Sequence, residues 1–145
     1  MWIELATKFY PEATFERGAP DGTLSSLQER LGIRLPTDLL KLLGETDGIS
    51  TDEGLGRIVW STTRILSDNL EMRGGLYAGL YMPFDDLVFF ADAGNGGRFG
   101  FPVPLGSLEA GPDVFAWDHE DDSRKWVAPS LPKYLEWWAT GKILL

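Results

Sequence analysis

Leucines that recur every three or four residues predict two short helices in the first third of the chain. Residues 23–31 form the first helix, and Asp21 or Thr23 is able to cap its start. Pro36 separates this helix from a second one, which Thr37 can cap. The two apolar faces consist of Leu24, Leu27 and Leu31, and of Leu39, Leu42 and Leu43.

The middle and the end of the chain show two more helices of this kind. Residues 61–63 are typical of a helix cap. The apolar positions that follow this cap are Ile65, Leu66 and Leu70. Ser130 can cap a closing helix, and Gly141 lies just beyond its end. The apolar face of the closing helix consists of Leu131, Tyr134, Leu135 and Trp138.

Short apolar runs bounded by turn residues predict the strands. Residues 57–60 form the first of them. Residues 87–91 are apolar without interruption, which is typical of a central strand covered on both faces. The Asn-Gly dipeptide at 95–96 favours a hairpin with a two-residue turn, in which both turn residues have positive φ. Residues 114–117 and 126–127 form two further strands, joined by an exposed hairpin tip.

These elements together predict an α+β fold with N-terminal helices, an antiparallel β-meander of about four to six strands and a C-terminal helix. Residues 74–82 are rich in glycine and tyrosine, and we expect a loop anchored by aromatic side chains. The 145 residues fit a single domain over 1–145. A 43% apolar share with six Trp, four Tyr and eight Phe supplies a core and argues against intrinsic disorder.

The net negative charge of the chain excludes some classes of binding partner. The chain has 22 acidic and 13 basic residues, a formal net charge of −9, and Arg124–Lys125 is its only adjacent basic pair. We therefore expect no binding to nucleic acid or to an anionic membrane. An acidic surface suits a basic partner, although acidity that serves only solubility gives the same composition. Because the chain has no cysteine and no run of ~18 apolar residues, we expect a cytoplasmic protein.

Most catalytic sites require residues that this sequence lacks or spaces badly. His119 is the single histidine, and no nucleophile motif accompanies it, which argues against a serine-type triad. The pattern Asp118-x-Glu120-x-Asp122 resembles the start of a calcium loop, but its sixth position is not the required glycine. No phosphate-cradling glycine motif is present. We therefore expect no catalytic residue, metal or cofactor, and a hydrolase that uses carboxylates such as Asp92 is the alternative.

Acidic residues form three clusters at predicted loops or strand ends, and no basic residue interrupts them. The clusters are Glu45, Asp47, Asp52 and Glu53; Asp85, Asp86 and Asp92; and Asp113, Asp118, Glu120, Asp121 and Asp122. Carboxylates beside aromatic residues can steer a basic partner and hold it, whereas ordinary solvated turns give the same pattern. The partner-binding residues that we predict are Asp118, Glu120, Asp121 and Asp122, then Asp85, Asp86 and Asp92, and Trp137. Trp137 lies opposite the apolar face of the closing helix, so it is either exposed or covered by the segment around Trp2.

Several segments, in their order along the chain, resemble the SUKH superfamily. Its opening signature is similar to Leu-Gly-Ile-Arg-Leu-Pro-Thr-Asp-Leu, followed by Asp-Gly, and its central hairpin to Phe-Phe-Ala-Asp-Ala-Gly-Asn-Gly, followed by Phe-Gly-Phe. Its next strand and closing helix also have counterparts. The matching residues are 31–39 with 47–48, 89–96 with 99–101, 114–120, and 130–138. The resemblance spans roughly residues 22–141 and therefore most of the chain.

This resemblance implies an α+β fold and a non-enzymatic binding protein. Most bacterial members are immunity proteins that neutralise toxin domains, often nucleases, and the fungal Smi/Knr relatives regulate cell-wall synthesis as interaction modules. We therefore expect this chain to bind a basic cognate toxin, such as a nuclease, through its acidic surface. The alternative is a regulatory or scaffold module without a toxin partner. Many relatives carry an acid directly after the Gly-Asn-Gly turn, where this chain has Gly97.

Overall fold

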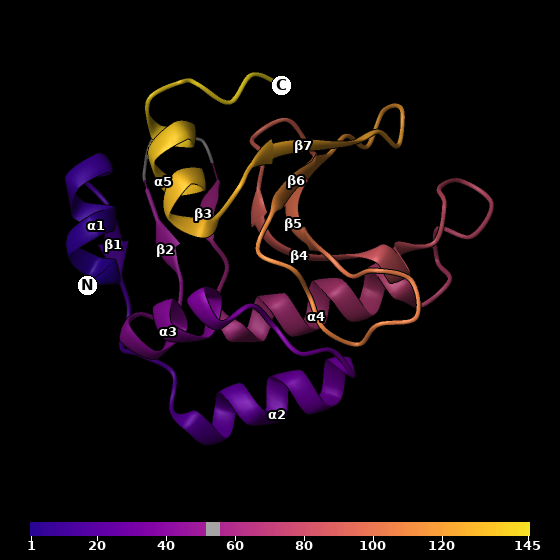
Figure 1. Cartoon of the computed structure of the whole chain (residues 1–145), viewed down its shortest axis with the longest axis horizontal. Coiled ribbons are helices and arrows are strands. Elements are labelled where there is room, and N and C mark those ends of the chain that lie inside the picture. The colour runs from indigo at the N-terminus through magenta and orange to yellow at the C-terminus, as the bar shows by residue number, and fades with distance from the viewer. Residues whose placement is uncertain (52–55) are drawn as a thin grey trace.

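The chain combines helices with two antiparallel sheets in a computed structural model that describes residues 1–51 and 56–145 (Figure 1). The helices are α1 (Trp2–Phe9), α2 (Asp21–Leu31), α3 (Thr37–Glu45), α4 (Thr62–Arg73) and α5 (Leu131–Ala139), with a short 3₁₀ helix η1 (Phe84–Asp86). The strands are β1 (Thr14–Phe15), β2 (Ile49–Ser50), β3 (Arg57–Val59), β4 (Leu87–Asp92), β5 (Arg98–Pro102), β6 (Val114–Trp117) and β7 (Arg124–Ala128). The predicted α+β fold is confirmed.

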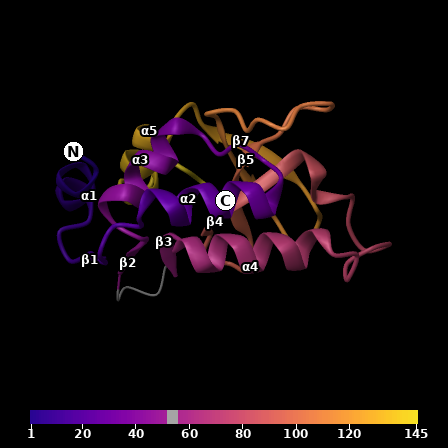
Figure 2. The same ribbon diagram turned by 90° about the horizontal axis from the view of Figure 1, so that it is seen from below.

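The two sheets differ in size and in how well the sequence predicts them. Strands β4, β5, β6 and β7 follow one another in a four-stranded meander, as predicted, while β1, β2 and β3 form a smaller sheet. Only β3 of the smaller sheet was predicted. Helix α2 packs against α4, and α1 packs against α3 and α5 (Figures 1 and 2). None of the helices in the described residues is long and apolar enough to cross a membrane.

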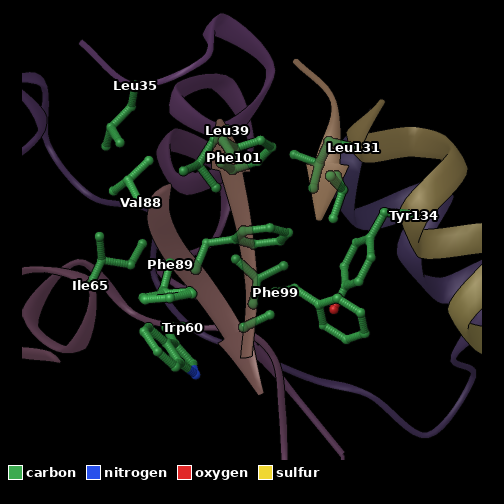
Figure 3. Close-up of a cluster of buried hydrophobic side chains, with 14 of the residues drawn as sticks. Leu35, Leu39, Trp60, Ile65, Val88, Phe89, Phe99, Phe101, Leu131 and Tyr134 are labelled. Atoms are coloured by element: carbon green, nitrogen blue, oxygen red, sulfur yellow. The ribbon is translucent and has the colours of Figure 1, made fainter. Parts of the chain in front are cut away.

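Aromatic side chains join α5 to both sheets. Figure 3 shows Tyr134 of α5 pointing toward Phe99 of β5, and their ring centroids are 4.9 Å apart. Phe90 and Phe101 stack on each other at 4.4 Å, and Phe90 meets the edge of Tyr134 at 5.1 Å. The Tyr134 hydroxyl donates a hydrogen bond of 2.8 Å to the Ile58 carbonyl of β3. This buried cluster fixes the meander against the smaller sheet and the closing helix.

Strand β4 is apolar and buried from Leu87 to Ala91, as predicted, and it ends at Asp92. It lies at the edge of its sheet rather than at the centre, so the prediction of a central strand was wrong. Residues outside the sheet supply hydrogen-bond partners for the backbone groups at the free edge of β4. The Trp60 backbone N–H donates to the Phe90 carbonyl at 2.7 Å. The Asn69 side-chain amide accepts from the Phe89 N–H and donates to the Phe89 carbonyl, both at 2.8 Å. The Asn69 side chain therefore makes the two hydrogen bonds to Phe89 that a neighbouring strand would otherwise make.

This role of Asn69 changes the buried face of α4. Asn69 is 0% exposed, and Ile65 and Met72 are also buried. Leu70, which the sequence placed on the apolar face, is 42% exposed. The amide also donates to the Ile65 carbonyl at 2.7 Å, so its polar atoms are satisfied inside the core.

The helix caps follow the predictions at α4 and α5 but not at α2 and α3. The cap expected at Asp21 or Thr23 does not form, and neither does the cap expected at Thr37, because Pro20 and Pro36 occupy the cap positions. Both prolines have an extended ψ, of 155° and 142°, and proline has no side-chain acceptor for the first N–H groups of the helix. The confirmed caps are Ser61 and Ser130, which accept the backbone N–H groups of Arg64 and Lys133.

The hairpin between β4 and β5 has a wider turn than the predicted one. Gly94 and Gly96 have positive φ values of 81° and 90°, whereas Asn95 does not have positive φ. The Ala93 N–H donates to the Gly97 carbonyl at 3.1 Å and closes the loop. A Cβ atom at Gly97 would lie 2.3 Å from the Trp117 carbonyl oxygen, so this backbone leaves no room for an acidic side chain there.

Candidate interaction surface

The hairpin tip between β6 and β7 contacts the segment that precedes β4, which lies far away in the sequence. The Tyr81 hydroxyl donates to the His119 carbonyl at 2.8 Å, and the Met82 N–H donates to Asp122 Oδ2 at 2.8 Å. The glycine- and tyrosine-rich loop is thus anchored by an aromatic residue, as predicted. Figure 1 shows that this loop and the tip lie at the end of the molecule opposite α1.

Arg124 and Asp122 hold the two segments together. Asp122 Oδ1 accepts the Trp117 Nε1–H at 2.8 Å and pairs with Arg124 Nη2 at 3.0 Å. Arg124 Nη1 pairs with Asp86 at 2.6 Å. The same guanidinium donates to the carbonyls of Met82 and Pro83. Asp86 and Asp122, which belong to two different predicted acidic clusters, therefore meet at Arg124.

Aromatic rings pack against this junction. Trp117 meets the edges of Tyr81 at 5.0 Å and of Phe84 at 5.3 Å between ring centroids. The Arg124 guanidinium lies 4.7 Å above the Phe84 ring, where a cation is attracted to the ring face. Because Arg124 has only 14% of its side chain exposed, its charge is held inside the junction rather than offered to a partner.

The carboxylates that remain accessible form what we call the acidic surface: Asp85, Asp86, Asp118, Glu120 and Asp121. The Asp118 carboxylate accepts the Glu120 N–H, and the Asp121 carboxylate accepts the Ser123 N–H, both at 2.9 Å. The bonds from Ser123 lower the pKa of Asp121 below its ordinary value. These short turns fix the tip while the carboxylates stay at the surface, so the tip combines negative charge with a defined backbone.

Asp122, predicted as a binding residue of an exposed tip, belongs to the framework instead. Its side chain is only 18% exposed, and its backbone has a positive φ of 60°. Burial alone would raise the pKa of Asp122, but the hydrogen bonds from Met82, Trp117 and Arg124 lower it below its ordinary value. The ionised carboxylate is therefore the form that the fold stabilises.

We expect Asp122→Asn to lower the free energy of unfolding by about 2 kcal/mol near neutral pH, because the amide loses charge-assisted hydrogen bonds. A depressed folded-state pKa stabilises the fold above the unfolded value of about 3.9, and this contribution is lost as pH falls through the folded value. The deficit of the variant should therefore shrink near about pH 3. Urea denaturation at both pH values measures it, and an equal deficit at both would contradict the assignment.

Asp92 lies apart from the acidic surface and is used within the fold. It forms a two-pronged ion pair with Arg64, with distances of 2.7 and 2.9 Å, and it accepts the Arg57 N–H at 2.9 Å. The Arg64 guanidinium also lies 4.3 Å above the Trp60 ring. The structure therefore does not bring Asp92 together with the other predicted binding residues.

The first acidic cluster also has contacts inside the fold. Glu45 Oε1 accepts the N–H groups of Trp2 and Ile3 at 2.9 and 3.3 Å, and so satisfies the start of α1. Asp47 accepts the Thr62 N–H at 2.7 Å at the start of α4. The other two members of the cluster, Asp52 and Glu53, lie outside the described residues.

Trp137 is partly buried, and its neighbours come from the C-terminal part of the chain. The Lys142 ammonium lies 4.2 Å from the centre of its ring, and the Trp126 ring is 6.4 Å away in an edge-to-face arrangement. Trp2 is 1% exposed and belongs to the core. Trp137 therefore lies apart from the acidic surface and forms a separate aromatic site with Trp126.

Sequence reasoning missed two features of this region. One is Arg124, whose role depends on contacts with residues about 40 positions earlier in the chain. The other is a set of exposed apolar side chains beside the acidic surface. They are Leu76, Leu80 and Met82, which are 68%, 72% and 70% exposed. All three lie on the loop whose Met82 N–H donates to Asp122, and exposed apolar side chains that form a contiguous patch mark interaction sites in proteins.

Comparison with known proteins identifies the family. The model of the SMI1 / KNR4 family (SUKH-1) matches residues 18–137, which include every element from α2 to the start of α5 and the whole acidic surface. No curated protein matches the chain at a significant level. The family match covers most of the 145 residues. The chain therefore belongs to the SMI1/KNR4 family (SUKH-1).

Proposed function

We propose that this chain is a non-catalytic immunity protein that binds a basic toxin domain and blocks its substrate-binding surface. The observation that carries the proposal is the junction at Arg124, which joins Asp86 to the hairpin tip in one acidic surface. Family membership supports a role in binding, and the net charge of −9 supports a basic partner.

The geometry supports competition with a polyanionic substrate. A nuclease must present cationic side chains to phosphate groups, and exposed carboxylates at fixed positions can pair with the same side chains. Long-range attraction between the two surfaces accelerates association, while the apolar side chains of the neighbouring loop add contact area. Because the tip is held by hydrogen bonds before a partner arrives, little conformational entropy is lost on binding.

Co-expression with a toxin domain whose gene neighbours this one tests the proposal. We expect cells that produce the toxin domain to survive when they also produce this chain, and the purified proteins to form a stable complex. Asp122→Asn, which loosens the junction without removing an accessible carboxylate, serves as a graded variant and should protect less. Equal killing with and without this chain, together with no complex between the purified proteins, would refute the proposal.

A regulatory or scaffold module of the same fold is the second candidate, because the matching family is the one named for SMI1 and KNR4. In that case the acidic surface would bind a host protein rather than a toxin. Gene context separates the two candidates. A neighbouring gene for a secreted toxin favours the immunity role, and an isolated gene whose loss alters the cell wall favours the regulatory one.

A further inference from the structure

A groove runs from α2 toward the acidic surface. Its widest part, with a volume of about 790 Å³, lies between the α2–α3 region and residues 107–109. A second cavity of about 350 Å³ lies beside it, and Ile33 and Leu108 line both cavities. A third cavity of about 260 Å³ shares Arg73 and Asp85 with the second. The three cavities are therefore neighbours along one path, in which Asp85 and Asp86 both line the middle cavity.

Exposed apolar side chains line this path. Leu105 and Leu108, on the loop between β5 and β6, are 106% and 74% exposed, and Met82 is 70% exposed. Both loops that carry these side chains lie at the end of the molecule opposite α1 (Figures 1 and 2). Three large apolar side chains along one groove cost hydration free energy in the unbound protein, and a bound apolar segment would remove that cost.

The polar groups of the groove indicate the chemistry of the segment. Carboxylates outnumber cations among its lining residues: Glu29, Glu109, Asp85 and Asp86 against Arg34 and Arg73. The one side-chain hydrogen bond of Arg73 in the described part of the chain runs from Nη2 to the Leu87 carbonyl, and its Nε is buried without a partner. Burial lowers the pKa of Arg73, against the opposing influence of Asp85 and Asp86. An acceptor in the groove would stabilise this guanidinium.

We propose that the groove binds a short segment of the protein partner in which leucine-like side chains alternate with lysine or arginine. The apolar side chains contact Leu105, Leu108 and Met82, and the basic side chains pair with the carboxylates along the walls. Arg73 donates to a main-chain carbonyl of the segment. The identity of the partner rests on the proposed function, whereas the chemistry of the segment rests on the groove itself.

Two synthetic peptides test the groove without the toxin. One is a fluorescein-labelled amphipathic peptide of leucine and lysine, and the other has glutamate in place of each lysine. We expect the full-length protein to bind the lysine peptide and not the glutamate peptide, as measured by fluorescence anisotropy. The double variant Leu105→Ser, Leu108→Ser should weaken binding about fivefold, because it removes apolar contacts and leaves the charge unchanged.

The matched control is Leu144→Ser, Leu145→Ser, which changes two leucines that are also exposed, at 76% and 54%, but do not line the groove. We expect it to bind the lysine peptide like the wild type. Equal binding by the groove variant, or equal binding of both peptides, would overturn the inference. If the toxin domain binds the groove variant and the wild type equally well, the groove inference fails and the proposed function stands. If the toxin domain binds neither the groove variant nor the wild type, the proposed function fails. The peptide measurements then test the groove inference by themselves.

Discussion

The triple variant Asp85→Asn, Glu120→Gln, Asp121→Asn should associate with a basic partner about tenfold more slowly at low salt. All three side chains are exposed, while the ion pairs of this region use Asp86 and Asp122. The substitutions keep size and local hydrogen bonding, including the acceptor for the Ser123 N–H, so they remove charge alone. Stopped-flow association with the toxin domain at several ionic strengths measures the effect, and the salt dependence of the variant should be flatter.

A matched control separates local charge from net charge. The variant Glu4→Gln, Glu12→Gln, Glu16→Gln removes the same charge from exposed positions in the N-terminal part of the chain, at the other end of the molecule (Figure 1). We expect its association rate to stay within about twofold of the wild type, because screening limits the influence of distant charges. Equal slowing by both variants would show that total charge, rather than the acidic surface, governs the encounter.

The largest loss of stability is expected for Asn69→Ala. The change leaves the N–H and carbonyl groups of Phe89 without their partner inside the core, and each unsatisfied group costs about 1–3 kcal/mol. Alanine returns about 0.5 kcal/mol through its higher helix propensity. We therefore expect the free energy of unfolding to fall by about 3 kcal/mol, measured by urea denaturation.

Ser67→Ala is the control on the same helix. Ser67 is exposed, and its hydroxyl makes only long contacts of 3.4 Å with Arg64 and Asp68. Its replacement should change the free energy of unfolding by no more than about 0.5 kcal/mol. A similar loss in both variants would mean that the helix, and not the edge of β4, determines the result.

The spacing of apolar residues predicted those helices and strands that have one buried face. The leucines of α2 and α3 recur at helical spacing because one side of each helix packs into the core. Strands β1 and β2 are two residues long, which is too short for an alternating pattern to appear. Asn69 carries no such signal, because its burial follows from its position beside β4 and not from its neighbours in the sequence.

At the acidic tip, too, the sequence alone does not show which residues are buried by contacts with distant parts of the chain. Glu120 and Asp122 are equivalent in the sequence, since both are acids of one predicted turn. They differ in the structure because the Met82 N–H and the Trp117 indole converge on Asp122 and leave Glu120 exposed. Sequence spacing could place the carboxylates on a loop, but only the fold distinguishes those that hold the surface together from those that remain accessible.

The junction at Arg124 also governs when the surface comes into existence during protein synthesis. Met82 and Asp122 are separated by 40 positions, and a ribosome adds about 5–20 residues per second. A nascent chain that ends before β7 lacks the guanidinium that joins the two segments, so it presents separate loops rather than one acidic surface. Under the proposed function, recognition of the partner therefore requires a chain in which β7 has been made and paired.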